Sequence, residues 1–307
     1  MKISTHLLFD RASTQMSNVQ SNLTQTQTQL AQGKQIINAS DSPNQAANIQ
    51  RLKSILSRQE SYQNSLNTIK ARLESEDTTL NSAGNLLVRA KEVAVQGAND
   101  TLSSSDRKAL GTELQALRDQ LLSLANTRDS NGNYLFSGSR VKQAAFVETA
   151  NGSPVYMGDQ TRMNVRVGEQ RSIPVNRTGT DAFVPVPRAD TKNNSTGVGF
   201  FQVLDDLISG LNSSKGTDIR RGLGEIDTLT QGVSLARAQI GTNLNVVDQQ
   251  SSVVEDTTLN LKTTLSSIED LDYASAITKM NQQMMSLEAA QSSFAKISQL
   301  NLFNYIK

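Results

Sequence analysis

Several stretches of this 307-residue sequence carry residue types that could do chemistry. The single histidine, His6, could act as a base or bind a metal, but no carboxylate cluster lies near it in the sequence. Asp129-Ser130-Asn131-Gly132-Asn133 begins like a calcium-binding loop, which needs a glycine at its sixth position and a bidentate glutamate at its twelfth. Tyr134 and Arg140 stand at those two positions, so the stretch predicts a turn.

Two other patterns also fail as catalytic or binding motifs. Gly197-Val198-Gly199 continues to Gln202 without the third glycine that a phosphate-binding loop requires. The neighbouring carboxylates Asp205-Asp206 and Glu269-Asp270 point in different directions if they lie on helices, which is typical of solvated faces. We therefore expect neither enzyme activity nor a metal or cofactor.

The strongest pattern is a heptad repeat in the C-terminal half. Its aliphatic positions are Ile226, Val233, Ile240, Val247, Val254, Leu261 and Ile268. An apolar residue at every seventh position keeps one stripe of a long helix against a partner helix. The spacing thus predicts a coiled-coil helix rather than a compact globule.

The N-terminal half carries a matching stripe. It comprises Leu52, Gln59, Leu66, Leu73, Leu80 and Leu87, and a parallel line runs through Ile55, Tyr62, Ile69, Glu76, Ala83 and Ala90. We expect a mainly α fold in which both halves of the chain form a long antiparallel coiled-coil-like rod, with a core at Leu52, Leu66, Leu73, Leu80, Ile240, Val247, Val254 and Leu261. Polar residues in the stripes, Glu76 among them, would fix the register. The pattern alone leaves open an intramolecular bundle with no further role.

Composition excludes several classes of protein. Thirty basic and 29 acidic residues give a net charge of +1, without a basic stripe that would follow a nucleic-acid backbone. The chain has no cysteine, and no apolar run is long enough to span a membrane. The early run Leu7-Leu8-Phe9 is too short for the apolar region of a secretory signal peptide.

Both ends combine an apolar stripe with few charges. Met16, Leu23, Leu30 and Ile37 stand seven apart, and Met284, Leu287 and Phe294 follow helical spacing near the C-terminus. Between them lie mainly Gln, Ser, Thr and Asn, which are cheap to bury against a neighbour that offers hydrogen bonds. We expect these residues to form an assembly interface that is poorly ordered in the free monomer. Frayed termini without a role are the alternative.

The remaining elements can be placed by their boundary residues. Ser42-Pro43 predicts the start of the first long helix and Gly97 its end, while Ser103 or Ser105 caps a third rod helix with a leucine stripe. Residues 140–196 contain most of the prolines and alternate with a period of two, which predicts a β-rich insert at the far end of the rod. Residues 190–199 read as a linker, followed by an amphipathic helix from Phe200.

Both ends also resemble a known family. The stretches that carry the resemblance are Met1–Thr5, Gln29–Lys34, Asn38–Pro43, Ile268–Ala276 and Ser293–Ile306. They resemble the terminal signatures of the flagellin family, and Asn131–Gly138 with Phe146 downstream resembles its hook-associated branch. The resemblance covers roughly residues 1–140 and 200–307; the β-rich insert matches only in position.

The resemblance implies a structural part of the bacterial flagellum, an adaptor at the hook–filament junction that polymerises through its terminal helices. The implied division is residues 1–42 and 270–307 as inner-tube helices, 43–139 and 197–269 as the rod, and 140–196 as an outer insert. Implied partners are hook-associated protein 1, flagellin, copies of the chain itself in a ring and an export chaperone. Secretion through the flagellar type III apparatus would need no cleaved signal peptide. A short flagellin and a cytoplasmic coiled-coil interaction protein are the alternatives.

Overall fold

The computed structural model describes residues 2–149, 152–189 and 195–299. Helices take up 71% of the chain, with the long helices packed together and small antiparallel strand pairs beside them, which confirms the expected fold class. The chain divides into two compact units, residues 1–59 with 256–307 and residues 60–255. The three-part division expected above stays a prediction. None of the described helices combines the length and the hydropathy needed to cross a membrane.

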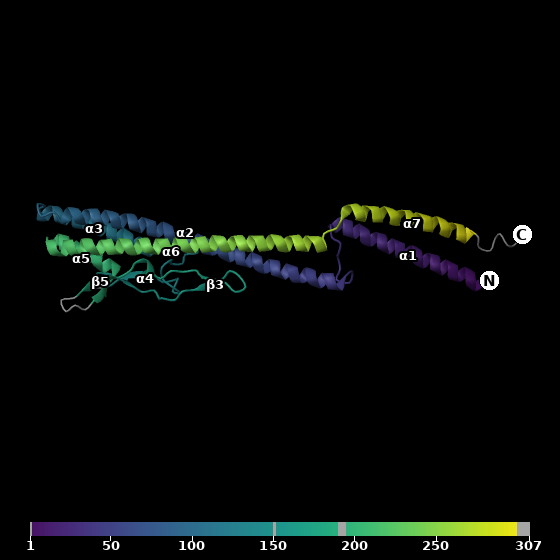
Figure 1. Cartoon of the computed structure of the whole chain (residues 1–307), viewed down its shortest axis with the longest axis horizontal. Coiled ribbons are helices and arrows are strands. Elements are labelled where there is room, and N and C mark those ends of the chain that lie inside the picture. The colour runs from purple at the N-terminus through teal and green to yellow at the C-terminus, as the bar shows by residue number, and fades with distance from the viewer. Residues whose placement is uncertain (1, 150–151, 190–194, 300–307) are drawn as a thin grey trace. The chain divides into compact units, whose positions relative to one another are not determined.

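Two helices pair along the larger unit. They are α2 (Pro43–Gly97) and α6 (Gly216–Glu269), and each continues into the smaller unit. Their side chains pair in opposite chain order: Gln63 with Ser251 at 2.7 Å, Lys70 with Asp248 at 2.8 Å, Asp77 with Arg237 at 2.9 Å and Lys91 with Asp227 at 2.5 Å. The four α2 residues occupy one heptad position. The two helices are therefore antiparallel, as expected (Figure 1).

The heptad stripes lie in the core of this unit. Leu66, Leu73, Leu80 and Leu87 on α2 and Val233, Ile240, Val247 and Val254 on α6 are all 0–3% exposed. Leu52 and Leu261, which fall in the smaller unit, are only half-buried. Burying an aliphatic side chain of this size contributes about 1.5–3 kcal/mol, so the eight buried residues supply much of the stabilisation of the helix pair.

Two further helices complete the larger unit's helical layer. They are α3 (Ser104–Ala125) and α5 (Phe200–Asn212), which pack against each other. Ser103 caps α3 through a capping box with Asp106, and α2 ends at Gly97, as the sequence predicted. A side chain at Gly97 would collide with Leu211 of α5, so this glycine permits a close approach of the two helices.

The insert consists of three two-stranded antiparallel sheets and a short helix. The strands are β1 (Phe146–Glu148), β2 (Pro154–Tyr156), β3 (Asn164–Arg166), β4 (Ser172–Pro174), β5 (Val186–Ala189) and β6 (Ser195–Val198), paired in sequence order; the helix is α4 (Gly179–Ala182). The period-two alternation within residues 140–196 correctly predicted β3 and β4, in which Val165 pairs with Ile173. The linker expected at residues 190–199 is partly wrong, because Ser195–Val198 pairs with β5; residues 190–194 lie outside the described residues.

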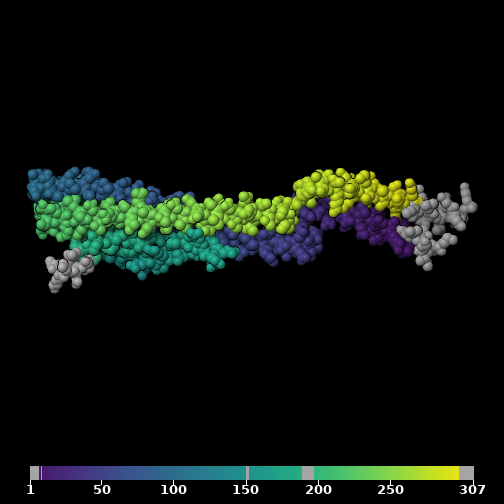
Figure 2. Space-filling model, viewed as in Figure 1, coloured from purple at the N-terminus to yellow at the C-terminus, as the bar shows by residue number. Residues whose placement is uncertain are grey.

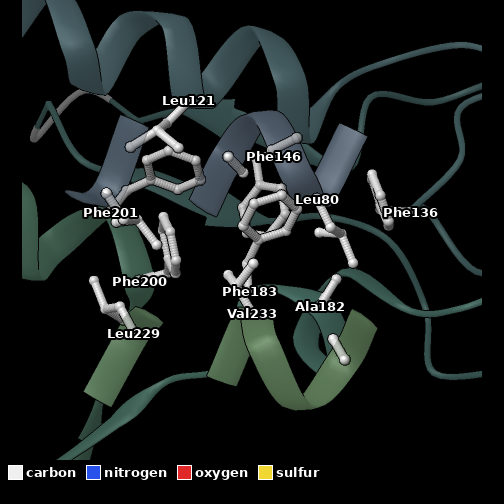
Figure 3. Packing of buried hydrophobic residues seen from close by; sticks show 14 of the residues in the cluster. Leu80, Leu121, Phe136, Phe146, Ala182, Phe183, Phe200, Phe201, Leu229 and Val233 are labelled. Atoms are coloured by element: carbon white, nitrogen blue, oxygen red, sulfur yellow. The ribbon is translucent and has the colours of Figure 1, made fainter. Parts of the chain in front are cut away.

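A cluster of phenylalanines joins the insert to the helices (Figure 3). Phe183, which follows α4, has its ring centroid 5.4 Å from that of Phe136, 5.6 Å from Phe146 and 5.1 Å from Phe200, all edge to face. This geometry is favoured because the positive edge of one ring meets the negative face of the next. The cluster gives the small sheets the apolar core that two strands alone cannot provide.

The insert lies alongside the helices, and the expectation that it projects from the far end is wrong. Arg177 donates to Gln239 at 2.9 Å, Arg171 to Gln250 at 3.3 Å and Arg188 to Glu225 at 2.7 Å. The insert therefore follows α6 over several turns. In Figure 2 the teal insert lies against green α6. The reason is chemical: the insert's arginines find their acceptors on α6, and its phenylalanines pack against Phe200 of α5.

The smaller unit contains the terminal helices α1 (Lys2–Gln32) and α7 (Tyr273–Gln299), which lie side by side (Figure 1). The rings of Phe9 and Phe294 are in tilted contact with centroids 4.7 Å apart, while Lys34 and Asp270 form a β-bridge at the opposite ends of these helices. The two helices are therefore antiparallel. The start of α2 and the end of α6 complete this unit.

Candidate assembly interface

The facing surfaces of α1 and α7 hold most of the predicted assembly residues. Since Phe9 meets Phe294, each further heptad along the pair brings Met16 level with Leu287 and Leu23 level with Met280. All of these except Phe9 are half-buried, and so is Leu30. These apolar side chains thus pack within one chain, between its own helices α1 and α7.

A second apolar stripe on α7 faces outward. Ile277, Met284 and Met285 are 42–62% exposed, and Ile277 and Met284 stand one heptad apart. Met284 is therefore the predicted assembly residue that the structure leaves open to solvent. Ile277 follows the helical spacing of the C-terminal segment but was not among the predicted interface residues, and Met285 was missed by sequence reasoning.

Ile37, the last of the predicted residues, lies in the segment between α1 and α2. It lines a groove of about 440 Å³ together with Ile36, Ile49 and the two lysines Lys34 and Lys53. Ile37 itself is half-buried, whereas Ile36 and Ile49 are buried. It is therefore separate from the α1–α7 pair, and its role in assembly stays a prediction.

Four threonine hydroxyls on α1 form hydrogen bonds inside the helix. Thr14, Thr24, Thr26 and Thr28 each donate to the carbonyl oxygen four residues earlier, at 2.8–3.0 Å. From Ala12 to Gln32 the helix carries no charged residue. Covering this face with a neighbour would therefore break few hydrogen bonds and bury no charge, which keeps the cost of desolvation low.

A polar joint lies where α1 ends and α7 begins. Glu269 accepts from Lys34 at 2.7 Å and from Lys53 at 2.9 Å, while Leu271 N–H donates to the Gly33 carbonyl at 3.0 Å. Gly33 has a positive φ of 66° beside the Tyr273 hydroxyl, which requires glycine. The joint connects α1 and α7 through backbone as well as side chains.

The lysines also set the charge of Glu269. The hydrogen bond from Lys34, with that from Lys53, holds the pKa of Glu269 below its ordinary value, although burial opposes this. The joint is therefore stabilising above pH 4 to 5 and weakens as the pH falls through the lowered pKa. The view of Glu269-Asp270 as a solvated pair is wrong for Glu269, which is 7% exposed.

Two arginines of the larger unit form ion clusters that sequence reasoning missed. Arg118 on α3 contacts Asp119, Glu148 and Asp205 at 2.5–3.1 Å, and Arg188 on β5 contacts Asp206 and Glu225 at 2.6 and 2.7 Å. Asp205 and Asp206 do point apart, but each meets an arginine instead of solvent. Arg118 falls on the apolar stripe of α3, and that position was a signal of burial.

The predicted turn at Asp129 is present. The Asp129 carboxylate accepts from the backbone N–H groups of Asn131 and Asn133, both at 2.9 Å, and Gly132 N–H donates to the Asp129 carbonyl. The carboxylate thus serves the backbone of the turn. Among the described residues, no group of three or more His, Cys, Asp or Glu side chains is placed to hold a metal ion.

Both terminal regions of the chain match known protein families. Residues 3–141 match the model of the bacterial flagellin N-terminal helical region, and residues 223–306 match that of the C-terminal helical region. The chain is 27% identical to flagellar hook-associated protein 3 of Escherichia coli, with 100% of both chains covered, and 28% identical to that of Salmonella typhimurium, with 99% of both covered. The crystal structure of hook-associated protein 3 from Legionella pneumophila matches 72% of this chain and 98% of its own, with a TM-score of 0.67 and 21% identity.

Proposed function

Because this chain belongs to the bacterial flagellin family, we propose that it is the hook-associated adaptor that joins the hook side of the flagellum to the flagellin filament. The observation that carries the proposal is the likeness to hook-associated protein 3 along the whole chain. The adaptor is a structural part of the flagellum and polymerises through its terminal helices.

The α1–α7 pair supports this mechanism. Its inner faces hold the two ends of the chain together, and the outward stripe of Ile277, Met284 and Met285 remains for a neighbour. A two-helix pair with half-buried facing residues buries little apolar area, so it is weak by itself. A growing tip that already presents ordered helices lowers the entropy cost of adding the next subunit.

The proposal extends to partners and location. Hook-associated protein 1 lies toward the hook, flagellin lies toward the filament, and copies of this chain form the ring between them. Before export, a chaperone covers the C-terminal segment, and the chain leaves the cell through the flagellar type III apparatus without a cleaved signal peptide. The names of the relatives support the flagellar location.

Labelling of isolated flagella tests the location. Antibody-gold against this protein is expected to mark one zone between hook and filament, and the protein is expected to be scarce beside flagellin in sheared flagella. Label along the whole filament, with the protein as the main component, would replace the adaptor by a short flagellin. Protein found only in the cytoplasm would contradict both.

The outward stripe gives a second prediction. Replacing Ile277 and Met284 together by serine is expected to reduce incorporation into flagella on the order of tenfold, because each tenfold loss needs only about 1.4 kcal/mol of contact energy. The matched control is Leu235→Ser, which changes a 62% exposed leucine on α6. Quantitative blotting of hook–filament fractions measures the effect, and equal loss in both variants would remove the stripe from the interface.

A further inference from the structure

Glu76 is a buried acid on the α2 surface that faces α6. It is 0% exposed and lies between the core residues Leu73 and Leu80. Its Oε1 is 3.4 Å from Arg72 Nε, a long contact, and Oε2 has no hydrogen-bond partner among the described residues. The guanidinium of Arg72 is shared with the Leu135 carbonyl at 2.8 Å and with Asp129 at 3.7 Å. Glu76 is therefore poorly satisfied as a carboxylate.

A polar cleft of about 300 Å³ opens beside Glu76 between α2, α6 and the insert. Arg177, 8% exposed, lines it from the insert, and its guanidinium donates to Gln239 of α6 at 2.9 Å. The Nε of Arg177 has no partner among the described residues. A buried acceptor and a buried donor thus border the same space, which is large enough for several water molecules at about 30 Å³ each.

The charges around Glu76 come from three sides. α2 supplies Arg72, the turn after α3 supplies Asp129 behind Arg72, and the insert supplies Arg177 with the ion pair Arg162–Asp181 at 2.9 Å. α6 offers only the neutral amides of Gln239 and Asn243. Burial raises the pKa of Glu76 to about 7, although Arg72 and Arg177 act against it.

We propose that Glu76 and Arg177 form a proton-controlled joint that fastens the insert to the helix pair. With a neutral Glu76 the packing between α2 and α6 needs no counter-charge, and Arg177 stays bound to Gln239. When Glu76 loses its proton, its carboxylate competes with Gln239 for Arg177 and draws water into the cleft. The insert then opens more often from α6. The joint is independent of the proposed role at the junction.

The direction with pH follows from the raised pKa. Between about pH 4.3, where an unfolded glutamate titrates, and about pH 7 the folded chain keeps a proton that the unfolded chain has lost. The stability that this proton contributes is complete below that window and is lost as the pH rises through it. Above pH 8 no further change comes from this group.

Thermal unfolding of the full chain from pH 5 to pH 9 tests the joint. Between pH 5 and pH 8 the Tm of the wild type is expected to fall about 5 °C more than that of Glu76→Gln, which keeps the shape and cannot ionise. Glu74→Gln, an exposed change on the same helix, is expected to follow the wild type. Parallel curves for the wild type and Glu76→Gln would overturn the proposal.

A second measurement needs no variant. Hydrogen exchange of the wild type, corrected for intrinsic rates, is expected to show faster opening of residues 171–178 at pH 8 than at pH 5, while residues 110–121 of α3 stay unchanged. Equal opening at both pH values would overturn the joint even if Glu76→Gln failed to fold. Either failure leaves the labelling result at the junction untouched.

Discussion

Cells that make only a chain without residues 1–40 are expected to carry bare hooks and to release unpolymerised flagellin into the medium. The deletion removes all of α1, so Met16, Leu23 and Leu30 no longer cover the inner face of α7. The larger unit, residues 60–255, keeps its own core and should stay folded. Electron microscopy of a deletion strain complemented with this chain measures filament loss, and circular dichroism of the purified chain measures its helices.

A single substitution tests the contact between α1 and α7 without shortening the chain. Leu23→Asp places a charge between α1 and α7 and is expected to lower filament formation strongly, since an unpaired charge there must be desolvated. Gln20→Asp places the same charge on the exposed side of α1 and is expected to have little effect. Normal incorporation of the shortened chain, or of Leu23→Asp, would refute assembly through the paired ends.

Replacing Phe183 by alanine is expected to lower the free energy of unfolding of the larger unit by about 3–5 kcal/mol. Phe183 is 2% exposed and its ring contacts those of Phe136, Phe146 and Phe200, so the change leaves a cavity that these rings can fill only in part. The insert should detach first, because the aromatic cluster is its main apolar link to the helices. Urea unfolding followed by circular dichroism measures the loss.

Val184→Ala is the matched control, because Val184 is the next residue and is 38% exposed. It should change the free energy of unfolding by no more than about 0.5 kcal/mol. A loss below about 1 kcal/mol for Phe183→Ala would mean that the arginine contacts, and not the rings, hold the insert in place.

The helical part of the fold could be predicted because its signals are local and repeated. Seven-residue spacing marked the stripes of α2 and α6, Gly97 marked the end of α2 and Ser103 the start of α3. Each signal depends on neighbours within about two turns of the same helix. The terminal stripes were found in the same way, although sequence could not divide them into the face between α1 and α7 and the face left open.

The ion clusters and the position of the insert could not be predicted in this way. Arg118 and Asp205 are 87 residues apart, and Arg188 and Glu225 are 37 apart, so their pairing depends on the tertiary fold. The strand at Ser195–Val198 was missed because its polar residues resemble a loop, and only its pairing with β5 makes it a strand. Glu269 was taken for a solvated acid because Lys34 lies far from it in the sequence.

The ladder of side-chain pairs between α2 and α6 also determines which of several equivalent alignments the chain adopts. A shift of α6 by seven residues would still place aliphatic side chains against Leu66, Leu73 and Leu80. The apolar contacts therefore hardly discriminate between these alignments. Such a slip would put Lys91 next to Arg220 in one direction and next to Ser234 in the other, and Asp77 would meet Thr230 or Leu244 in place of Arg237. These surface pairs therefore select one alignment of α6 along α2, although each adds only about 0–1 kcal/mol to stability.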